Sequence, residues 1–218
     1  VVNASNIEKD WNWIKENNMF GVEMTDISDS TGLLAIQGPK ACEAMQSLTD
    51  IKLSEMEFYT HQTGTFAGVE NVVVATTGYT GSGGIEIYVP NTSMEKVWNA
   101  VFEAGKSYGI EPIGLAARDT LRLEKGFCLY GNDINDTTNP LEAGLGWITK
   151  LNHDFTASDI IQKVKEEKVT RRLVGFKMID RGIPRHDYPV VDAEGNEIGI
   201  VTSGTQSPSL DEAIGMAY

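Results

Sequence analysis

Three consecutive parts of the sequence decide its fold class: Asn71-Val-Val-Val-Ala-Thr-Thr77, Gly78-Tyr-Thr-Gly-Ser-Gly-Gly84 and Ile85-Glu-Ile-Tyr-Val89. The β-branched run in the first part and the strict alternation in the last part both predict strands. A phosphate-binding cradle needs a helix after its glycines, so that the helix N–H groups face the anion. Because a strand follows here, the glycines are typical of a tight hairpin turn, and a nucleotide-binding fold is disfavoured.

The patterns on either side of this hairpin alternate between helix and strand. Helices are expected from the capping box Ser5-Asn-Ile-Glu8 to about residue 16, at 38–48, from residue 92, at 115–125 and at 158–167, and further strands at 21–28, 32–37 and 57–66. The first three residues resemble the end of a strand. This mixture predicts an α+β domain over residues 1–150, which we expect to be incomplete at its N-terminus.

The pattern of predicted secondary structure changes from residue 173 onward. Short strand-like runs are separated there by turn signals such as Ile183-Pro and Glu194-Gly-Asn, which is typical of a small β-barrel. We therefore expect a helical connector at 151–168 and a C-terminal β-barrel domain at 169–218, incomplete at Tyr218. The predicted fold class is α+β, followed by a partial C-terminal β-barrel.

Composition excludes several classes of function. The 218 residues include 18 Lys and Arg against 31 Asp and Glu, so the net charge is −13, which disfavours binding to nucleic acid or to anionic lipid. No apolar run approaches the roughly 18 residues that span a bilayer. Two cysteines and three histidines form neither a disulfide framework nor a zinc-site pattern, which favours a reducing, intracellular compartment and no metal.

Glu86 is the first candidate functional residue. Alternation along its strand puts Ile85 and Ile87 on one face and Glu86 with Tyr88 on the other. That second face is either a solvated outer surface or the lining of a cleft. In a cleft, the carboxylate would suit a ligand with two parallel N–H donors.

Basic side chains form a second candidate feature. Arg118, Arg122 and Lys125 share one face of a predicted helix at spacings of four and three residues. This face is either an exposed, salt-bridged surface or the position of an arginine that clamps a carboxylate. We place Arg122 on the outer face and expect Arg122→Lys to have little effect. No pairing of a nucleophile with a histidine is recognisable.

Several longer motifs resemble one known family. They are Gly114-Leu-Ala-Ala-Arg-Asp-Thr-Leu-Arg-Leu-Glu124, Leu129-Tyr-Gly-Asn-Asp133, Val2-Asn-Ala-Ser5, Ala35-Ile-Gln-Gly-Pro39, Gly78-Tyr-Thr-Gly81, Gly84-Ile-Glu86, Asn139-Pro-Leu-Glu142, Thr202-Ser-Gly204 and Ser207-Pro-Ser209. In this order they are similar to the aminomethyltransferase, or T-protein, family of the glycine cleavage system. The resemblance covers nearly all of the chain.

The resemblance implies ferredoxin-like folate-binding lobes and a specific reaction. Members take an aminomethyl group from the lipoyl arm of H-protein, release ammonia and form 5,10-methylenetetrahydrofolate, with tetrahydrofolate as co-substrate and without a metal. By resemblance, Glu86 binds the pterin ring and Arg118 the carboxylates of the glutamyl tail, while Asn3 and Tyr79 lie close to the ligand. The location implied is the cytoplasm, or the mitochondrion in a eukaryote.

The chain also departs from the family pattern. The family's catalytic aspartate lies upstream of the position of Val1, so no catalytic residue is assigned, and Asp10 does not match that segment. We therefore expect residues 1–218 alone to be inactive. Ser82 stands where the family usually has an acidic residue.

Two other functions remain possible at this point. One is a non-catalytic folate-binding regulator or iron–sulfur assembly factor of similar fold, whose usual Lys-Gly-Cys-Tyr motif differs from Lys125-Gly-Phe-Cys-Leu-Tyr130 here. The other is the folate-binding half of a sarcosine or dimethylglycine oxidase, which also needs a flavin-binding domain. The chain contains no Gly-x-Gly-x-x-Gly motif that would open such a domain.

Overall fold

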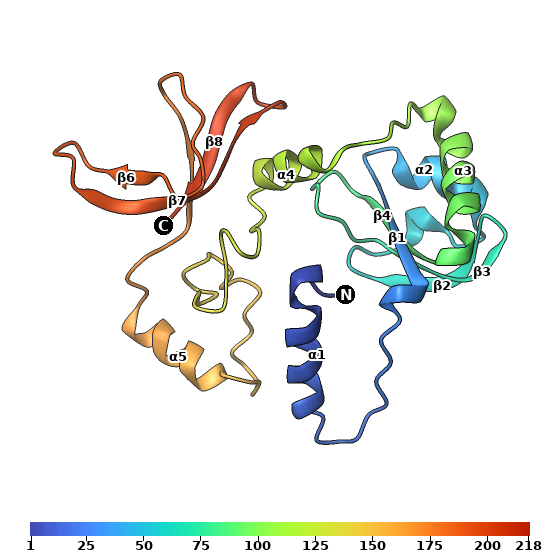
Figure 1. Ribbon diagram of the computed structural model, residues 1–218, viewed down its shortest axis with the longest axis horizontal. Helices are drawn as coiled ribbons and strands as arrows, with labels where there is room; N and C mark the ends of the chain where they lie inside the picture. The colour runs from blue at the N-terminus through green and yellow to red at the C-terminus, as the bar shows by residue number, and fades with distance from the viewer.

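The computed structural model describes residues 1–218 and contains two separate sheets, with helix α4 between them (Figure 1). The helices are α1 (Ile7–Glu16), α2 (Ala41–Met45), α3 (Met94–Gly105), α4 (Leu115–Glu124) and α5 (Ser158–Glu167). The strands are β1 (Thr31–Gln37), β2 (His61–Phe66), β3 (Val69–Ala75), β4 (Gly84–Pro90), β5 (Val174–Lys177), β6 (Pro189–Val191), β7 (Glu197–Ser207) and β8 (Glu212–Ala217). No helix combines the length and the apolar character that crossing a membrane requires.

The first sheet has the strand order β1-β4-β3-β2, and every neighbouring pair is antiparallel. Helices α2 and α3 cover one face of it and complete a core of apolar side chains. On β4, Ile85, Ile87 and Val89 point into this core and are 0% exposed. The predicted alternation is therefore confirmed, and Glu86 and Tyr88 lie on the opposite face of the sheet.

The second sheet has the order β5-β8-β7-β6, again antiparallel throughout. Strands β5 and β6 lie at its two edges and do not pair with each other, so the sheet curves without closing. The α+β class and the partial C-terminal barrel expected from the sequence are confirmed.

Helix α4 is attached to the second sheet by both apolar and polar contacts. Leu123 packs with Ile214 and Met216 of β8. The carboxylate of Glu124 accepts hydrogen bonds from the hydroxyl of Ser207 at 2.6 Å and from the hydroxyl and backbone N–H of Ser209 at 2.7 and 3.0 Å. The last turn of α4 is therefore fixed to the barrel strands, although the helix follows β4 and α3 of the first domain in the chain.

Three local predictions are wrong. Residues 21–28 form no strand, because no neighbouring strand pairs with their N–H and C=O groups. The first residues likewise lie in no strand. Ser5 does not cap α1: residues Ala4–Asn6 form a 3₁₀ turn that leads into the helix, so that Asn6 takes the cap position without a side-chain bond.

The contacts of Glu124 predict how stability depends on pH. Burial opposes ionisation of Glu124, but hydrogen bonds from Ser207 and Ser209 outweigh it and lower the pKa below 4.5. A carboxyl whose pKa is lower in the folded state contributes stability above its unfolded pKa and loses that contribution as the pH falls through its folded pKa. We expect Glu124→Gln to lower the urea midpoint at neutral pH, by a difference that shrinks below about pH 4.5. A difference that stays constant across the acid range would contradict this.

Candidate functional site

Glu86 lies on β4 between two alanines, Ala35 of β1 and Ala75 of β3, which are its direct partners across the sheet. Cross-strand partners share a face, so only the methyl groups of two alanines flank the carboxylate across the sheet. Thr77 donates its hydroxyl to one carboxylate oxygen, Oε2. The other oxygen accepts no hydrogen bond from the protein and can accept one from a ligand.

Tyr88 adds an aromatic side chain to the same face of β4. Burial raises the pKa of its phenol, and the nearby charge of Glu86 raises it further. The ring therefore stays neutral near pH 7, and the only charge that β4 places on this face is the carboxylate of Glu86.

Tyr79 lies in the glycine-rich turn that precedes β4. Its hydroxyl donates to the backbone carbonyl of Cys128, and its ring stacks on Phe127 with centroids 5.8 Å apart and planes inclined at 27°. Burial is the main cause of a raised pKa of Tyr79, so the phenol keeps its proton and remains a donor. The loop after α4 thus holds the tyrosine in one orientation.

Arg118, from the first turns of α4, lies against the same tyrosine. Its guanidinium carbon is 4.4 Å from the centroid of the Tyr79 ring, a cation–π contact. Arg118 is exposed and takes part in no ion pair with an acidic side chain. Its N–H groups are therefore free to form a bidentate contact with a carboxylate.

Gln37 fixes the turn that carries Tyr79. Its side-chain amide donates to the carbonyls of Thr77 at 3.2 Å and Ile85 at 3.3 Å, and its carbonyl accepts from Thr80 at 2.9 Å. Gly84 is required there, since its φ is +125° and a Cβ would lie 2.3 Å from the carbonyl oxygen of Ile36. The glycines therefore lie in a hairpin connection between β3 and β4, as the sequence predicted, but the connection spans residues 76–83 and is longer than the tight turn expected.

Asn3, the fourth residue that the sequence singled out, is not joined to the other three. It is exposed, and its side chain forms no hydrogen bond at the start of the 3₁₀ turn. The adjoining helix α1 is attached elsewhere, through Lys9, which contacts Asp136 at 2.8 Å and the hydroxyl of Tyr130 at 2.9 Å. The structure thus connects Tyr79 with Arg118 directly and with Glu86 through the 77–86 turn.

The prediction that Arg122 lies on the outer face of α4 is wrong. Its side chain is 2% exposed and is bonded to Asp133 at 2.7 Å and to the hydroxyl of Ser203 at 3.0 Å. The helix lies where the sequence predicts it, but strand β7 packs over Arg122, whereas Arg118 and Lys125 stay exposed. The only local signal that Arg122 is buried is its position between Leu121 and Leu123.

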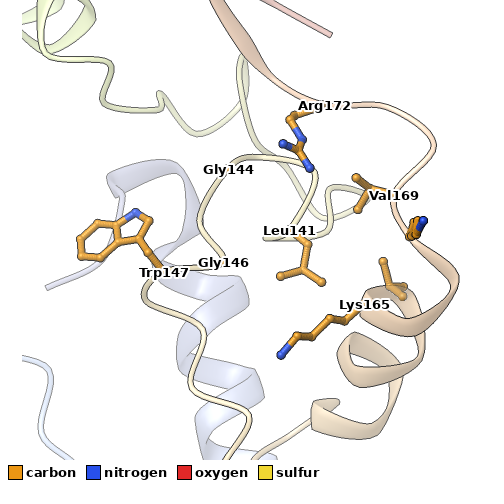
Figure 2. A pocket seen from close by; sticks show the side chains of 9 residues that line it. Leu141, Gly144, Gly146, Trp147, Lys165, Val169 and Arg172 are labelled. Atoms are coloured by element: carbon orange, nitrogen blue, oxygen red, sulfur yellow. The ribbon is translucent and has the colours of Figure 1, made fainter.

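Two cavities of the protein lie apart from these residues. One of about 540 Å³ is bounded by the loop at 141–147 and by α5 and its C-terminal extension. Figure 2 shows Leu141 and Lys165 facing this space, whereas Trp147 points away from it. A second, of about 580 Å³, adjoins β8. Neither is lined by Glu86, Tyr79 or Arg118. The structure places no three metal-binding side chains together.

Comparison with protein families gives two matches along the chain. Residues 1–153 match the family model described as the GCVT N-terminal domain. Residues 171–218 match the glycine cleavage T-protein C-terminal barrel domain. Together they account for most of the chain.

Individual relatives agree with these matches. The chain is 66% identical over 218 residues to a protein named aminomethyltransferase from Flavobacterium psychrophilum, and 58% identical over 220 residues to one from Bacteroides fragilis. Each alignment covers 100% of this chain and 61% of the relative, so the chain spans about three fifths of the length of these proteins. The crystal structure of glycine cleavage system aminomethyltransferase T from Bartonella henselae superimposes with a TM-score of 0.87 at 32% identity, over 99% of this chain and 58% of that one.

Proposed function

The chain belongs to the glycine cleavage T-protein family, and on that premise we propose that the protein is a tetrahydrofolate-dependent aminomethyltransferase. It would convert aminomethyl-lipoyl H-protein and tetrahydrofolate to 5,10-methylenetetrahydrofolate, ammonia and dihydrolipoyl H-protein. The observation that carries this proposal is a pair of charged side chains, Glu86 and Arg118, that can still form hydrogen bonds to a ligand. Both contact the 77–86 segment, Glu86 through Thr77 and Arg118 through Tyr79.

Glu86 suits a pterin ring. The ring presents a ring N–H and an exocyclic amino group side by side, and one carboxylate can accept from both. The oxygen already bonded to Thr77 has a second lone pair, and the other oxygen is free. Only the methyl groups of Ala35 and Ala75 flank the carboxylate across the sheet.

Arg118 suits the glutamyl tail of folate. A guanidinium presents parallel N–H groups that match the two oxygens of a carboxylate, and the ring of Tyr79 supports it from one side. We therefore assign the tail to Arg118, and to Tyr79 the role of positioning it. We also propose that Asn3 lies near the pterin, as the family resemblance implies. In this structure the side chain of Asn3 forms no hydrogen bond with Glu86, Tyr79 or Arg118, so it would have to reach the ligand independently of them.

The remaining parts of the proposal follow from the family. Residues 1–150 would form the folate-binding domain, 151–168 a connector and 169–218 the barrel domain. Lipoylated H-protein would be the partner and the cytoplasm the location. Neither a folate-dependent iron–sulfur assembly factor nor a folate-binding regulator is favoured by an observation of this structure.

The activity is tested with the full-length protein that contains residues 1–218. Aminomethyl-loaded H-protein and tetrahydrofolate are supplied, and ammonia and 5,10-methylenetetrahydrofolate are measured together. Equal amounts of the two products, dependent on both substrates, are expected. Binding of tetrahydrofolate without any release of ammonia from the loaded H-protein would instead favour a folate-binding protein that is not an enzyme of this kind.

For Glu86, we expect Glu86→Gln to weaken tetrahydrofolate binding more than Glu86→Asp. Glutamine keeps the length of the side chain but replaces an acceptor oxygen with an N–H donor, which opposes the pterin N–H. Loss of a charged hydrogen bond costs about 1.5–3 kcal/mol, or about 10- to 150-fold in Kd. Titration calorimetry measures it, with Glu70→Gln on the neighbouring strand β3 as the control. Unchanged affinity in Glu86→Gln would remove Glu86 from the site.

For Arg118, we expect Arg118→Lys to weaken the binding of folates that carry the glutamyl tail and to spare a tetrahydropterin without one. Lysine keeps the charge but lacks the planar pair of donors, and the loss is about 1–2 kcal/mol. Kd values for both ligands are compared with those of Arg185→Lys, a substitution at an exposed arginine of the barrel domain. An equal loss for the two ligands would show that Arg118 does not bind the tail.

A further inference from the structure

We propose that the buried pair of Arg122 and Asp133 is a positioning element through which barrel strand β7 sets the orientation of Tyr79 and Arg118. This inference rests on the proposed function, because its consequence is a defined affinity for the glutamyl tail of folate. Neither residue would touch the ligand. Both act through the segment 127–134, which follows α4 in the chain.

The first step of the path joins α4 to β7. Arg122 donates from Nη2 to the hydroxyl of Ser203 at 3.0 Å. Asp133 accepts a hydrogen bond from the hydroxyl of the neighbouring Thr202. All four side chains are buried, so these bonds are shielded from water and keep one geometry. Strand β7 thus contacts both members of the ion pair.

The second step fixes the segment that follows α4. Nη1 of Arg122 donates to the carbonyl of Phe127 at 3.1 Å and to Asp133 at 2.7 Å. The same carboxylate oxygen of Asp133 accepts the backbone N–H of Leu129 at 2.7 Å. Cys128 lies between these two anchored residues, so the direction of its carbonyl is set by the ion pair.

The third step reaches the candidate site. The carbonyl of Cys128 accepts the hydroxyl of Tyr79, and the ring of Phe127 stacks on the same tyrosine. Tyr79 in turn lies 4.4 Å from the guanidinium carbon of Arg118. Each contact is direct, and the path leads from a barrel strand to the group that would bind the tail.

The chemistry of the pair favours a positioning role over a purely stabilising one. Burial of two charges costs desolvation energy, and well-packed apolar residues often stabilise a core as well as a buried ion pair does. What an arginine adds is directional bonds in one plane. Here those bonds lead to two carboxylates, a hydroxyl and the Phe127 carbonyl, which is the arrangement that fixes a loop.

The test uses the full-length protein and a double-mutant cycle of Arg122→Lys with Arg118→Ala. Kd is measured for tetrahydrofolate and for a tetrahydropterin without the tail. Arg122→Lys is expected to weaken tetrahydrofolate binding by about tenfold, to leave the tail-free ligand within about twofold, and to add nothing in the Arg118→Ala background.

Two results would overturn the inference: an equal loss for both ligands, or an undiminished effect of Arg122→Lys when Arg118 is already alanine. Either would show that Arg122 serves stability alone. If the wild-type protein does not bind tetrahydrofolate, the proposed function is wrong, and the inference that rests on it is wrong as well. If the wild-type protein binds tetrahydrofolate but Arg122→Lys gives either of the two results above, only this inference is wrong.

A second pair of variants applies if Arg122→Lys does not fold. Ser203→Ala and Ser207→Ala each remove one buried hydroxyl of β7 that is bonded to α4, but Ser207 contacts Glu124 and not Arg122. We expect Ser203→Ala to reduce the preference for the tail-bearing ligand about threefold and Ser207→Ala to leave it unchanged. The same preference in both variants would overturn the role of β7.

Discussion

The ion pair between Arg122 and Asp133 is the interaction that joins α4, the segment after it and barrel strand β7. Two buried charges are stable only when their remaining hydrogen-bonding groups are satisfied. That condition is met here, because Asp133 also accepts from Leu129 and Thr202, while Arg122 also donates to Phe127, Ser203 and Asp119. Because these partners come from α4, from the segment after it and from β7, any displacement of one element would leave a charge unpaired in the interior.

Strand β4 imposes a second constraint, since one strand contributes to both the core and the candidate site. Ile85 and Ile87 are fully buried against α2 and α3, and this packing fixes the register of the strand. A shift by one residue would bury Glu86 and expose the isoleucines. The position of the carboxylate is therefore determined by the hydrophobic core behind it, and its direct partners across the sheet are the small residues Ala35 and Ala75.

What the sequence predicted and what it missed follow from the range of the interactions involved. The alternation of β4, the helix at 115–125 and the hairpin glycines depend on neighbouring residues, and each was found from local patterns. Arg122 was misplaced because Asp133 and Ser203 lie 11 and 81 residues away, and helical spacing says nothing about which face a distant strand will cover. The strand expected at 21–28 failed for the same reason, since pairing depends on a partner elsewhere in the chain. The contact between Tyr79 and Cys128, 49 residues apart, left no local signal.

The candidate site combines groups from elements of different rigidity. Glu86 is held by a sheet whose core fixes it, whereas Arg118 is an exposed side chain that extends from a helix and rests on a tyrosine. A mobile arginine would lose side-chain entropy on binding a carboxylate, and contact with an oriented aromatic ring reduces that loss before any ligand arrives. The orientation of the ring is set in turn by the segment that Arg122 and Asp133 hold. The buried hydrogen bonds of Arg122 and Asp133 therefore let Arg118 stay exposed to a ligand and still keep a defined orientation. Apolar side chains in the place of this pair form no directional bonds and would not fix that orientation.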